Sequence, residues 1–208
     1  MPELPEVETT VRGIKSIESS VIEKIDVFNP NLRWPISNDL PNFLSGKKIL
    51  SVYRLAKYII IKCSNAYLVI HLGMTGKLLF AKSSDTLKKH DHIQITFINN
   101  DQVIRYNDPR RFGSAHIVKD KLEDFELLSN LGLEPLAVEF DGNYLFTKAR
   151  KRNVPIKTFI MNHHIVVGVG NIYASEALFL SGIRPSVPAS KVTRKKMEIL
   201  VKNIKHVL

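Results

Sequence analysis

The sequence predicts an α+β fold in which an N-terminal helix and an antiparallel β-sandwich precede an all-α domain. Three observations predict it. Apolar residues have helical spacing at the start, short β-rich runs separated by turn residues follow, and the remaining chain returns to helical spacing. Of the 208 residues, 44% are hydrophobic and 24% are charged, which indicates a globular protein with a packed core.

The first helix is expected over residues 5–14. Pro5 suits the first turn of a helix, and Glu6 places a negative charge near the positive end of the helix dipole. One apolar face then follows from Val7, Val11 and Ile14.

Short runs rich in β-branched and aromatic residues come next, and turn-type residues such as Gly73, Asn99 and Gly113 separate them. Repeated short strands at this spacing indicate an antiparallel sandwich or barrel. The expected strands are 21–28, 49–53, 58–61, 67–72, 78–80, 93–98, 103–106 and 115–118.

The pattern becomes helical over residues 122–131, and a loop with proline and glycine spans 134–142. We therefore expect an N-terminal catalytic domain over residues 1–133 and a helical domain over 134–208. The last helix ends without a glycine or asparagine cap, so we expect the natural chain to continue. The expected helices of this domain are 144–150, 156–161, 172–181 and 191–208.

The charge balance favours a polyanionic partner. Thirty Lys and Arg against twenty Asp and Glu leave a formal charge of +10, and such an excess binds nucleic acid through counterion release. A ribosome-associated or architectural protein that uses only its charge is the alternative.

Location and metal content are bounded by what the sequence lacks. No apolar run is long enough to span a bilayer and no signal peptide is recognisable, so we expect a cytoplasmic protein without membrane contact, associated with the nucleoid in a bacterium. Cys63 is the only cysteine, which excludes an internal disulfide and a four-cysteine zinc site. His90 and His92 alternate, but two histidines without further ligands do not predict a metal site.

The N-terminus carries the most unusual chemistry. Methionine before a small residue is normally removed, which would leave Pro2 as a free secondary amine. An α-amine has a pKa of about 8, so a fraction of it is neutral and nucleophilic at pH 7. Attack on an aldehyde-like sugar carbon would give an iminium that permits strand scission by elimination. Glu3 and Glu6 either shuttle protons at this amine or merely complement the helix N-terminus.

Several motifs together resemble the formamidopyrimidine-DNA glycosylases. They occur in the order of that family and cover essentially the whole chain, which makes the match far more specific than a single glycine-rich fragment. The motifs are 1–9 (MPELPEVET), 33–35 (RWP), 56–58 (AKY), 70–76 (IHLGMTG), 89–92 (KHDH), 108–113 (DPRRFG) and 167–176 (VGVGNIYASE).

The resemblance implies a β-sandwich domain, a helix-two-turns-helix domain, and excision of oxidised purines such as 8-oxoguanine and formamidopyrimidines from double-stranded DNA, with strand cleavage at abasic sites. By matching position, Pro2 is implied as the Schiff-base nucleophile and Glu3 as the proton donor for base release. Lys57 is implied as a proton donor during elimination and a phosphate ligand, and we expect it at the start of a strand. Glu6 would orient the site.

The resemblance also implies DNA-contacting residues. A base that leaves the stack opens a void that must be filled, and Met74, Arg110 and Phe112 match the void-filling residues of the family. Without the resemblance, Met74 and Phe112 would be interpreted as core residues beside a turn. Asn171 is expected as a helix N-cap whose following amides face a phosphate. His71, His90, Arg152 and Asn171 are implied as contacts to the DNA backbone, and Glu176 as a neighbour of the flipped base.

The chain departs from the family pattern at its C-terminal side. Full-length members end in a zinc-binding hairpin module, so one zinc ion is expected there, whereas the residues present encode no cofactor. We therefore expect weak excision on intact lesion duplex by this chain, acting as a monomer. Two alternatives stay open, namely a sister glycosylase for oxidised pyrimidines and a noncatalytic lesion-binding module.

Overall fold

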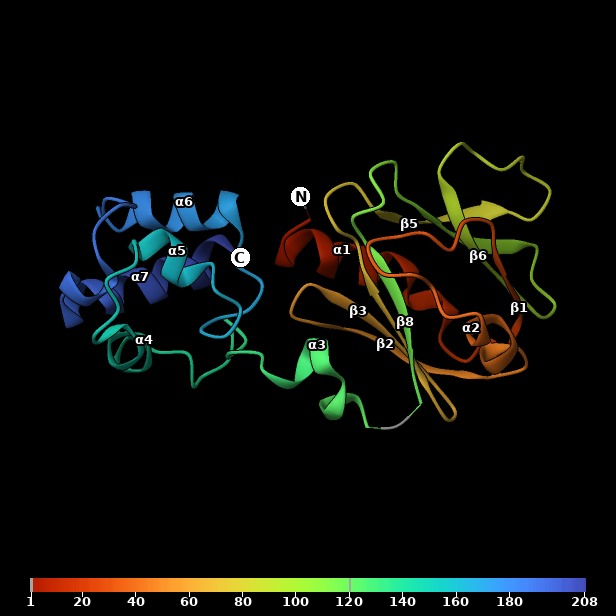
Figure 1. Ribbon diagram of the computed structural model, residues 1–208, viewed down its shortest axis with the longest axis horizontal. Coiled ribbons are helices and arrows are strands. Elements are labelled where there is room, and N and C mark those ends of the chain that lie inside the picture. Colours follow the sequence, from red (N-terminus) through yellow and green to blue (C-terminus); the bar gives the residue numbers. More distant parts are fainter. Residues whose placement is uncertain (1, 120) are drawn as a thin grey trace. The chain divides into compact units, whose positions relative to one another are not determined.

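The computed structural model describes residues 2–119 and 121–208. They form two compact units that divide between Phe125 and Glu126, and each unit is described by itself (Figure 1). The first unit contains an N-terminal helix and two antiparallel sheets, and the second is helical. The predicted α+β architecture is therefore confirmed.

The two units divide nearer the N-terminus than the expected boundary after residue 133. Gly132 N–H donates to His163 O at 2.7 Å, and Leu133 bridges Val166, so residues just before 134 belong to the helical unit. The helical pattern over 122–131 forms only two short pieces, η2 (Leu122–Asp124) and α3 (Glu126–Ser129). Extended backbone at Phe125, with ψ of 120°, separates them.

The first unit contains all eight expected strands. One sheet has the order β1-β6-β7-β5 and the other has the order β2-β3-β4-β8, with neighbouring strands antiparallel. The helix α2 (Asp39–Leu44) was not expected from the sequence. The strands are β1 (Ile22–Val27), β2 (Ile49–Leu55), β3 (Tyr58–Cys63), β4 (Tyr67–His71), β5 (Lys77–Lys82), β6 (Asp91–Phe97), β7 (Gln102–Asn107) and β8 (Ser114–Val118).

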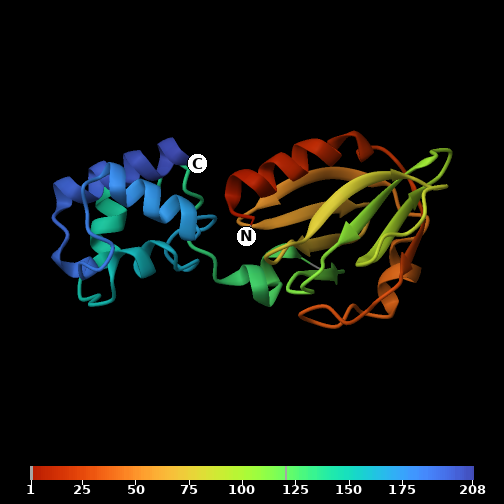
Figure 2. The same ribbon diagram turned by 90° about the horizontal axis from the view of Figure 1, so that it is seen from above.

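The helix α1 (Leu4–Ile14) lies across the sandwich, followed by the 3-10 turn η1 (Lys15–Ile17) (Figure 2). It packs against β2 and β5, which are edge strands of the two sheets. The predicted face of Val7, Val11 and Ile14 is buried in a core that both sheets share. This packing holds the first residues of the chain against the sandwich.

The second unit has its own apolar core, built by its helices and the loops between them. The long α7 (Arg194–Val207) packs against α4 (Gly142–Ala149) and α6 (Asn171–Leu180). Two turns separate α5 (Ile156–Ile160) from α6, as a helix-two-turns-helix motif requires. The final helix begins later than expected because Lys191 ends the 3-10 turn η3 (Ala189–Lys191) and Thr193 caps α7.

No helix within the described ranges combines the length and apolar character that a bilayer crossing requires.

Candidate active site

Glu3 is the anchor of the N-terminal segment. It is the N-cap of α1, and its side chain is only 1% exposed. The Glu3 backbone N–H donates to Glu6 Oε2 at 2.9 Å, while the Glu3 side chain accepts from the backbone of Glu6. Such a reciprocal cap satisfies two helix donors at once. Pro2, half-buried and next in the chain, is thereby held beside an oriented carboxyl group.

Lys57 interacts electrostatically with the carboxylates of both Glu3 and Glu6. Burial lowers the pKa of Lys57, and the negative charges of Glu3 and Glu6 oppose this lowering. A lysine with these opposing influences holds its proton less tightly than an exposed lysine but keeps an ionic partner. Lys57 is in the two-residue turn between β2 and β3, one residue before the strand start at which it was expected. The structure thus brings together Lys57 and the two carboxylates beside Pro2.

His71 is a neutral hydrogen-bond donor at the end of β4. The Gly73 backbone N–H donates to His71 Nδ1 at 3.0 Å, which leaves the ring proton on Nε2. Burial first, and then the charges of Lys57, Arg33 and His116, lower the pKa of His71 to about 4. The ring packs on Tyr58 with 4.9 Å between the ring centroids. His71 can therefore offer Nε2–H to an anion across the physiological pH range.

The half-buried His71 side chain makes the stability of the first unit pH-dependent. Below pH 6.5 this imidazole gains a proton in the unfolded chain, whereas in the folded chain it stays neutral until about pH 4. As the pH falls from 6.5 to about 4, we expect this residue to lower the free energy of unfolding by up to ~3 kcal/mol. Urea unfolding, followed through the fluorescence of the single tryptophan Trp34, measures it. A His71→Gln variant should lose less stability between pH 7 and pH 4; an equal loss would contradict this assignment.

Met74, Arg110 and Phe112 lie on two loops that are held against each other. Met74 is 39% exposed and Phe112 is 44% exposed, so neither is a core residue. The Arg110 guanidinium stacks over the Phe112 ring, with 4.6 Å between the guanidinium carbon and the ring centroid. Gly73, with φ of +62°, and Gly113 approach so closely that a Cβ on Gly73 would overlap the Gly113 backbone. Two apolar side chains and a cation therefore project from these two loops, residues 72–76 and 108–113, which together are called the double loop.

Asp108 joins these two loops from beneath. It is fully buried, and its Oδ1 accepts from the Thr75 hydroxyl at 2.6 Å. The other oxygen, Oδ2, accepts from the Gly113 backbone N–H at 2.9 Å and from the Tyr106 hydroxyl at 3.3 Å. Burial and the charge and hydrogen bond of Asp108 raise the pKa of Tyr106, so its hydroxyl remains a donor.

His90 and His92 have different surroundings. His90 precedes β6 with φ of +80°, and its backbone O accepts from Asp108 N–H at 3.1 Å. The His90 side chain is half-buried, whereas His92 is buried and its Nε2 donates to Asp108 O at 2.8 Å. His90 is thus bonded through its backbone to Asp108 in the double loop. The buried His92 side chain bonds to the backbone of the same residue.

Three predicted DNA contacts lie in the helical unit and are exposed. Arg152 is in the connection between α4 and α5, and Asn171 and Glu176 are on α6. The expectation that Asn171 is the N-cap of this helix is wrong. Gly170 is the N-cap, with extended backbone, and Asn171 is already helical. Glycine has no side chain, so Gly170 itself makes no side-chain cap hydrogen bond to α6.

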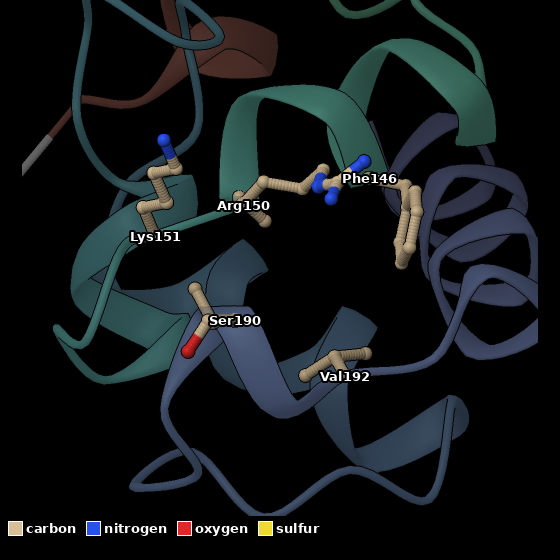
Figure 3. Close-up of a pocket in the computed structure, with 7 residues that line it drawn as sticks. Phe146, Arg150, Lys151, Ser190 and Val192 are labelled. Carbon is tan, nitrogen blue, oxygen red and sulfur yellow. The ribbon is translucent and has the colours of Figure 1, made fainter.

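A cavity of about 390 Å³ opens beside this basic connection. Figure 3 shows Arg150 and Lys151 on one side of it and Ser190 and Val192 on the other. The Arg194 guanidinium stacks over the ring of the lining residue Phe146, with 5.2 Å between the guanidinium carbon and the ring centroid. Arg150, Lys151 and Arg194 therefore place further positive charges near Arg152.

Sequence reasoning missed several residues that shape the site. Asp108 and Thr75 stand within quoted motifs, but only the folded loops reveal that they bond to each other. Arg33 stacks over Trp34 at 4.6 Å, and its backbone N–H donates to Gly113 O at 3.2 Å. Its charge also contributes to the lowered pKa of His71. The only sequence signal at these positions is that they lie within the quoted motifs.

The residues present do not fit a zinc ion. Within residues 2–119 and 121–208 no group of three or more His, Cys, Asp or Glu is arranged to hold a metal. Cys63 is buried, and burial raises the pKa of its thiol to about 11, which disfavours the thiolate that zinc needs.

Comparison with known proteins identifies both units. Residues 1–115 match the family model of the formamidopyrimidine-DNA glycosylase N-terminal domain, and residues 131–208 match the helix-two-turns-helix domain of the same enzymes. The formamidopyrimidine-DNA glycosylase of Pasteurella multocida is 48% identical over all of this chain and 76% of its own length. That of Hahella chejuensis is 46% identical over all of this chain and 77% of its own length.

Solved structures agree with this result. The Lactococcus lactis enzyme bound non-covalently to DNA with an abasic site is 30% identical, with a TM-score of 0.91 over 99% of this chain and 79% of that one. A mutant of the same enzyme in complex with DNA containing Fapy-dG is 31% identical, with a TM-score of 0.91 over 99% of this chain and 76% of that one. The chain described here belongs to the formamidopyrimidine-DNA glycosylase family.

Proposed function

We propose that this protein is a base-excision-repair glycosylase that removes oxidised purines from double-stranded DNA and cleaves the strand at the resulting abasic site. The observation that carries the proposal is the group at the start of α1. There, Glu3 is buried and capped beside Pro2, and Lys57 is electrostatically coupled to Glu3 and Glu6. A nucleophilic amine, a proton donor and a second ionisable group are the parts that this reaction needs.

Pro2 supplies the nucleophile once Met1 is removed. Its nitrogen attacks C1′ of the damaged nucleotide, the bond from C1′ to the base breaks, and the electron pair leaves with the base. The sugar ring opens to an iminium between the proline nitrogen and C1′. Loss of a proton from C2′ then expels the 3′ phosphate and cuts the strand, and water releases the proline.

The charged neighbours of Pro2 move the protons. Glu3, buried and oriented by its cap, is assigned the donation that accompanies base release and sugar opening. Glu6 orients that cap, because it accepts the Glu3 backbone N–H at 2.9 Å. Lys57, with its pKa lowered by burial, is assigned a proton transfer during elimination and a phosphate contact.

The double loop fills the void that the flipped base leaves. A thioether and a phenyl ring enter a base stack at low desolvation cost, which suits the exposed Met74 and Phe112. Arg110 has only donors, and these match the acceptors on the pairing edge of an orphaned cytosine. This arrangement supports a preference for lesions opposite C.

The remaining assigned residues bind the DNA backbone. His71 offers a neutral Nε2–H, and His90, Arg152 and Asn171 are assigned further phosphate contacts, with Glu176 near the flipped base. The net charge of +10 supports this assignment, since phosphate binding depends on such an excess. The related structures contain DNA with an abasic site or with Fapy-dG, which supports the choice of partner. Action as a monomer on cytoplasmic, nucleoid DNA completes the proposal.

Borohydride trapping on an abasic-site duplex tests this function. We expect the protein to form a covalent adduct with the DNA when its terminus is a free proline. Pro2→Gly retains a primary amine and should still trap, although more slowly, while chemical acetylation of the N-terminus should abolish trapping. Binding that is indifferent to the abasic site, without any adduct, would instead support a protein that uses only its charge.

A further inference from the structure

The Asp108 carboxylate is placed so that both void-filling loops depend on it. Its Oδ1 serves Thr75, which directly follows Met74 in the first loop. The same oxygen and the Thr75 hydroxyl both accept from the Arg110 backbone N–H, each at 3.3 Å. Oδ2 accepts from Gly113, the residue after Phe112 in the second loop. A single side chain therefore bonds beside all three predicted void-filling residues.

The bonds to Asp108 suit positioning more than general stability. Charge-assisted hydrogen bonds in a buried environment are short and directional, and the bond to Thr75 is the shortest of the set at 2.6 Å. The side chains that these bonds place are exposed, so the bonds hold surface groups rather than the apolar core. A displacement of about 1 Å in a recognition group can weaken its contribution severely.

We propose that Asp108, acting through Thr75, is a positioning residue that sets the discrimination for the base opposite the lesion. This inference rests on the proposed function, because it assigns Met74, Arg110 and Phe112 to the void. The Asp108 carboxylate fixes the position of Met74 relative to Arg110 before DNA binds. The guanidinium then meets the two adjacent acceptors of cytosine, N3 and O2, whereas the pairing edge of adenine offers a single acceptor, N1, beside its amino donor.

Thr75 provides a matched pair of variants. Thr75→Val replaces the hydroxyl by a methyl group of similar size, and Thr75→Ser keeps the hydroxyl. The assay compares initial trapping rates on abasic duplexes with C or with A opposite the abasic site. We expect Thr75→Val to lower the ratio of the C rate to the A rate by about tenfold, the loss typical of one hydrogen bond to a charged group, while Thr75→Ser stays within about twofold of the parent.

A single-stranded abasic oligonucleotide separates the two proposals. It has no opposite base, so the parent and both variants should trap it at equal rates if the N-terminal chemistry is intact. Failure of the parent to trap both the duplexes and the single strand would contradict the proposed function itself. An unchanged C to A ratio in Thr75→Val, together with normal single-strand trapping, would overturn the role of Asp108 alone. Should Thr75→Val fail to fold, Thr75→Ala deletes the same hydroxyl without overfilling the site.

Discussion

Glu3→Gln should release the damaged base at least ~100-fold more slowly than the parent protein, because a positioned general acid contributes about 10²–10⁴ to such a step. Glutamine keeps the shape of the side chain and can still accept the backbone hydrogen bond of the cap, but it cannot donate a carboxyl proton. Single-turnover excision of 8-oxoguanine, with protein in excess at low salt, measures this effect.

The same variant has an internal control. A preformed abasic site needs no base to leave, so Glu3→Gln should retain far more of its trapping rate there than of its excision rate. Glu8→Gln is the matched surface substitution, since Glu8 pairs with Arg12 at 3.0 Å and with Arg54 at 3.3 Å on the flank of the same helix. Equal losses of excision in Glu3→Gln and Glu8→Gln would contradict the assignment of Glu3 as the proton donor.

Gly113→Ala should strongly destabilise the first unit. A Cβ at this position would overlap the Tyr106 hydroxyl and would lie 2.5 Å from His71 O. Gly113 is buried, so neither neighbour can move without disturbing Asp108 or β4. We expect a loss of about 3 kcal/mol or more in the free energy of unfolding, at the upper end of overpacking effects. Urea unfolding followed by Trp34 fluorescence measures it.

Gly13→Ala is the matched control for that substitution. Gly13 is within α1, and a Cβ there would meet no atom within 4 Å. Alanine favours a helix over glycine by about 0.5–1 kcal/mol, so this variant should be slightly more stable than the parent. If Gly113→Ala were as stable as Gly13→Ala, the close approach of the two loops would be wrong.

Local patterns in the sequence predict most of the fold. The eight strands follow from short runs of β-branched and aromatic residues bounded by turn residues, and α1 follows from the helical spacing of its apolar face. Short elements were harder, because α2 and α3 are too short to show a helical period. The cap of α6 was misplaced by one residue because asparagine is a common N-cap, whereas Gly170 occupies that position.

The candidate site was predicted by motif rather than by physical derivation from single residues. Lys57 is far from Pro2 and Glu3 in the sequence, and only the packing of α1 against β2 explains why Lys57 is coupled to Glu3. Asp108 could not be singled out, since an Asp-Pro pair is ordinarily a turn signal. Its role emerges from bonds between loops that are 33 residues apart in the chain.

Peptide mass spectrometry of the borohydride-trapped adduct tests the central claim most directly. After nuclease and protease digestion, the sugar remnant should be found on the imino nitrogen of Pro2, in a terminal peptide that has lost Met1. A remnant on Lys57 or any other lysine, or an adduct formed by protein that still carries Met1, would contradict the account.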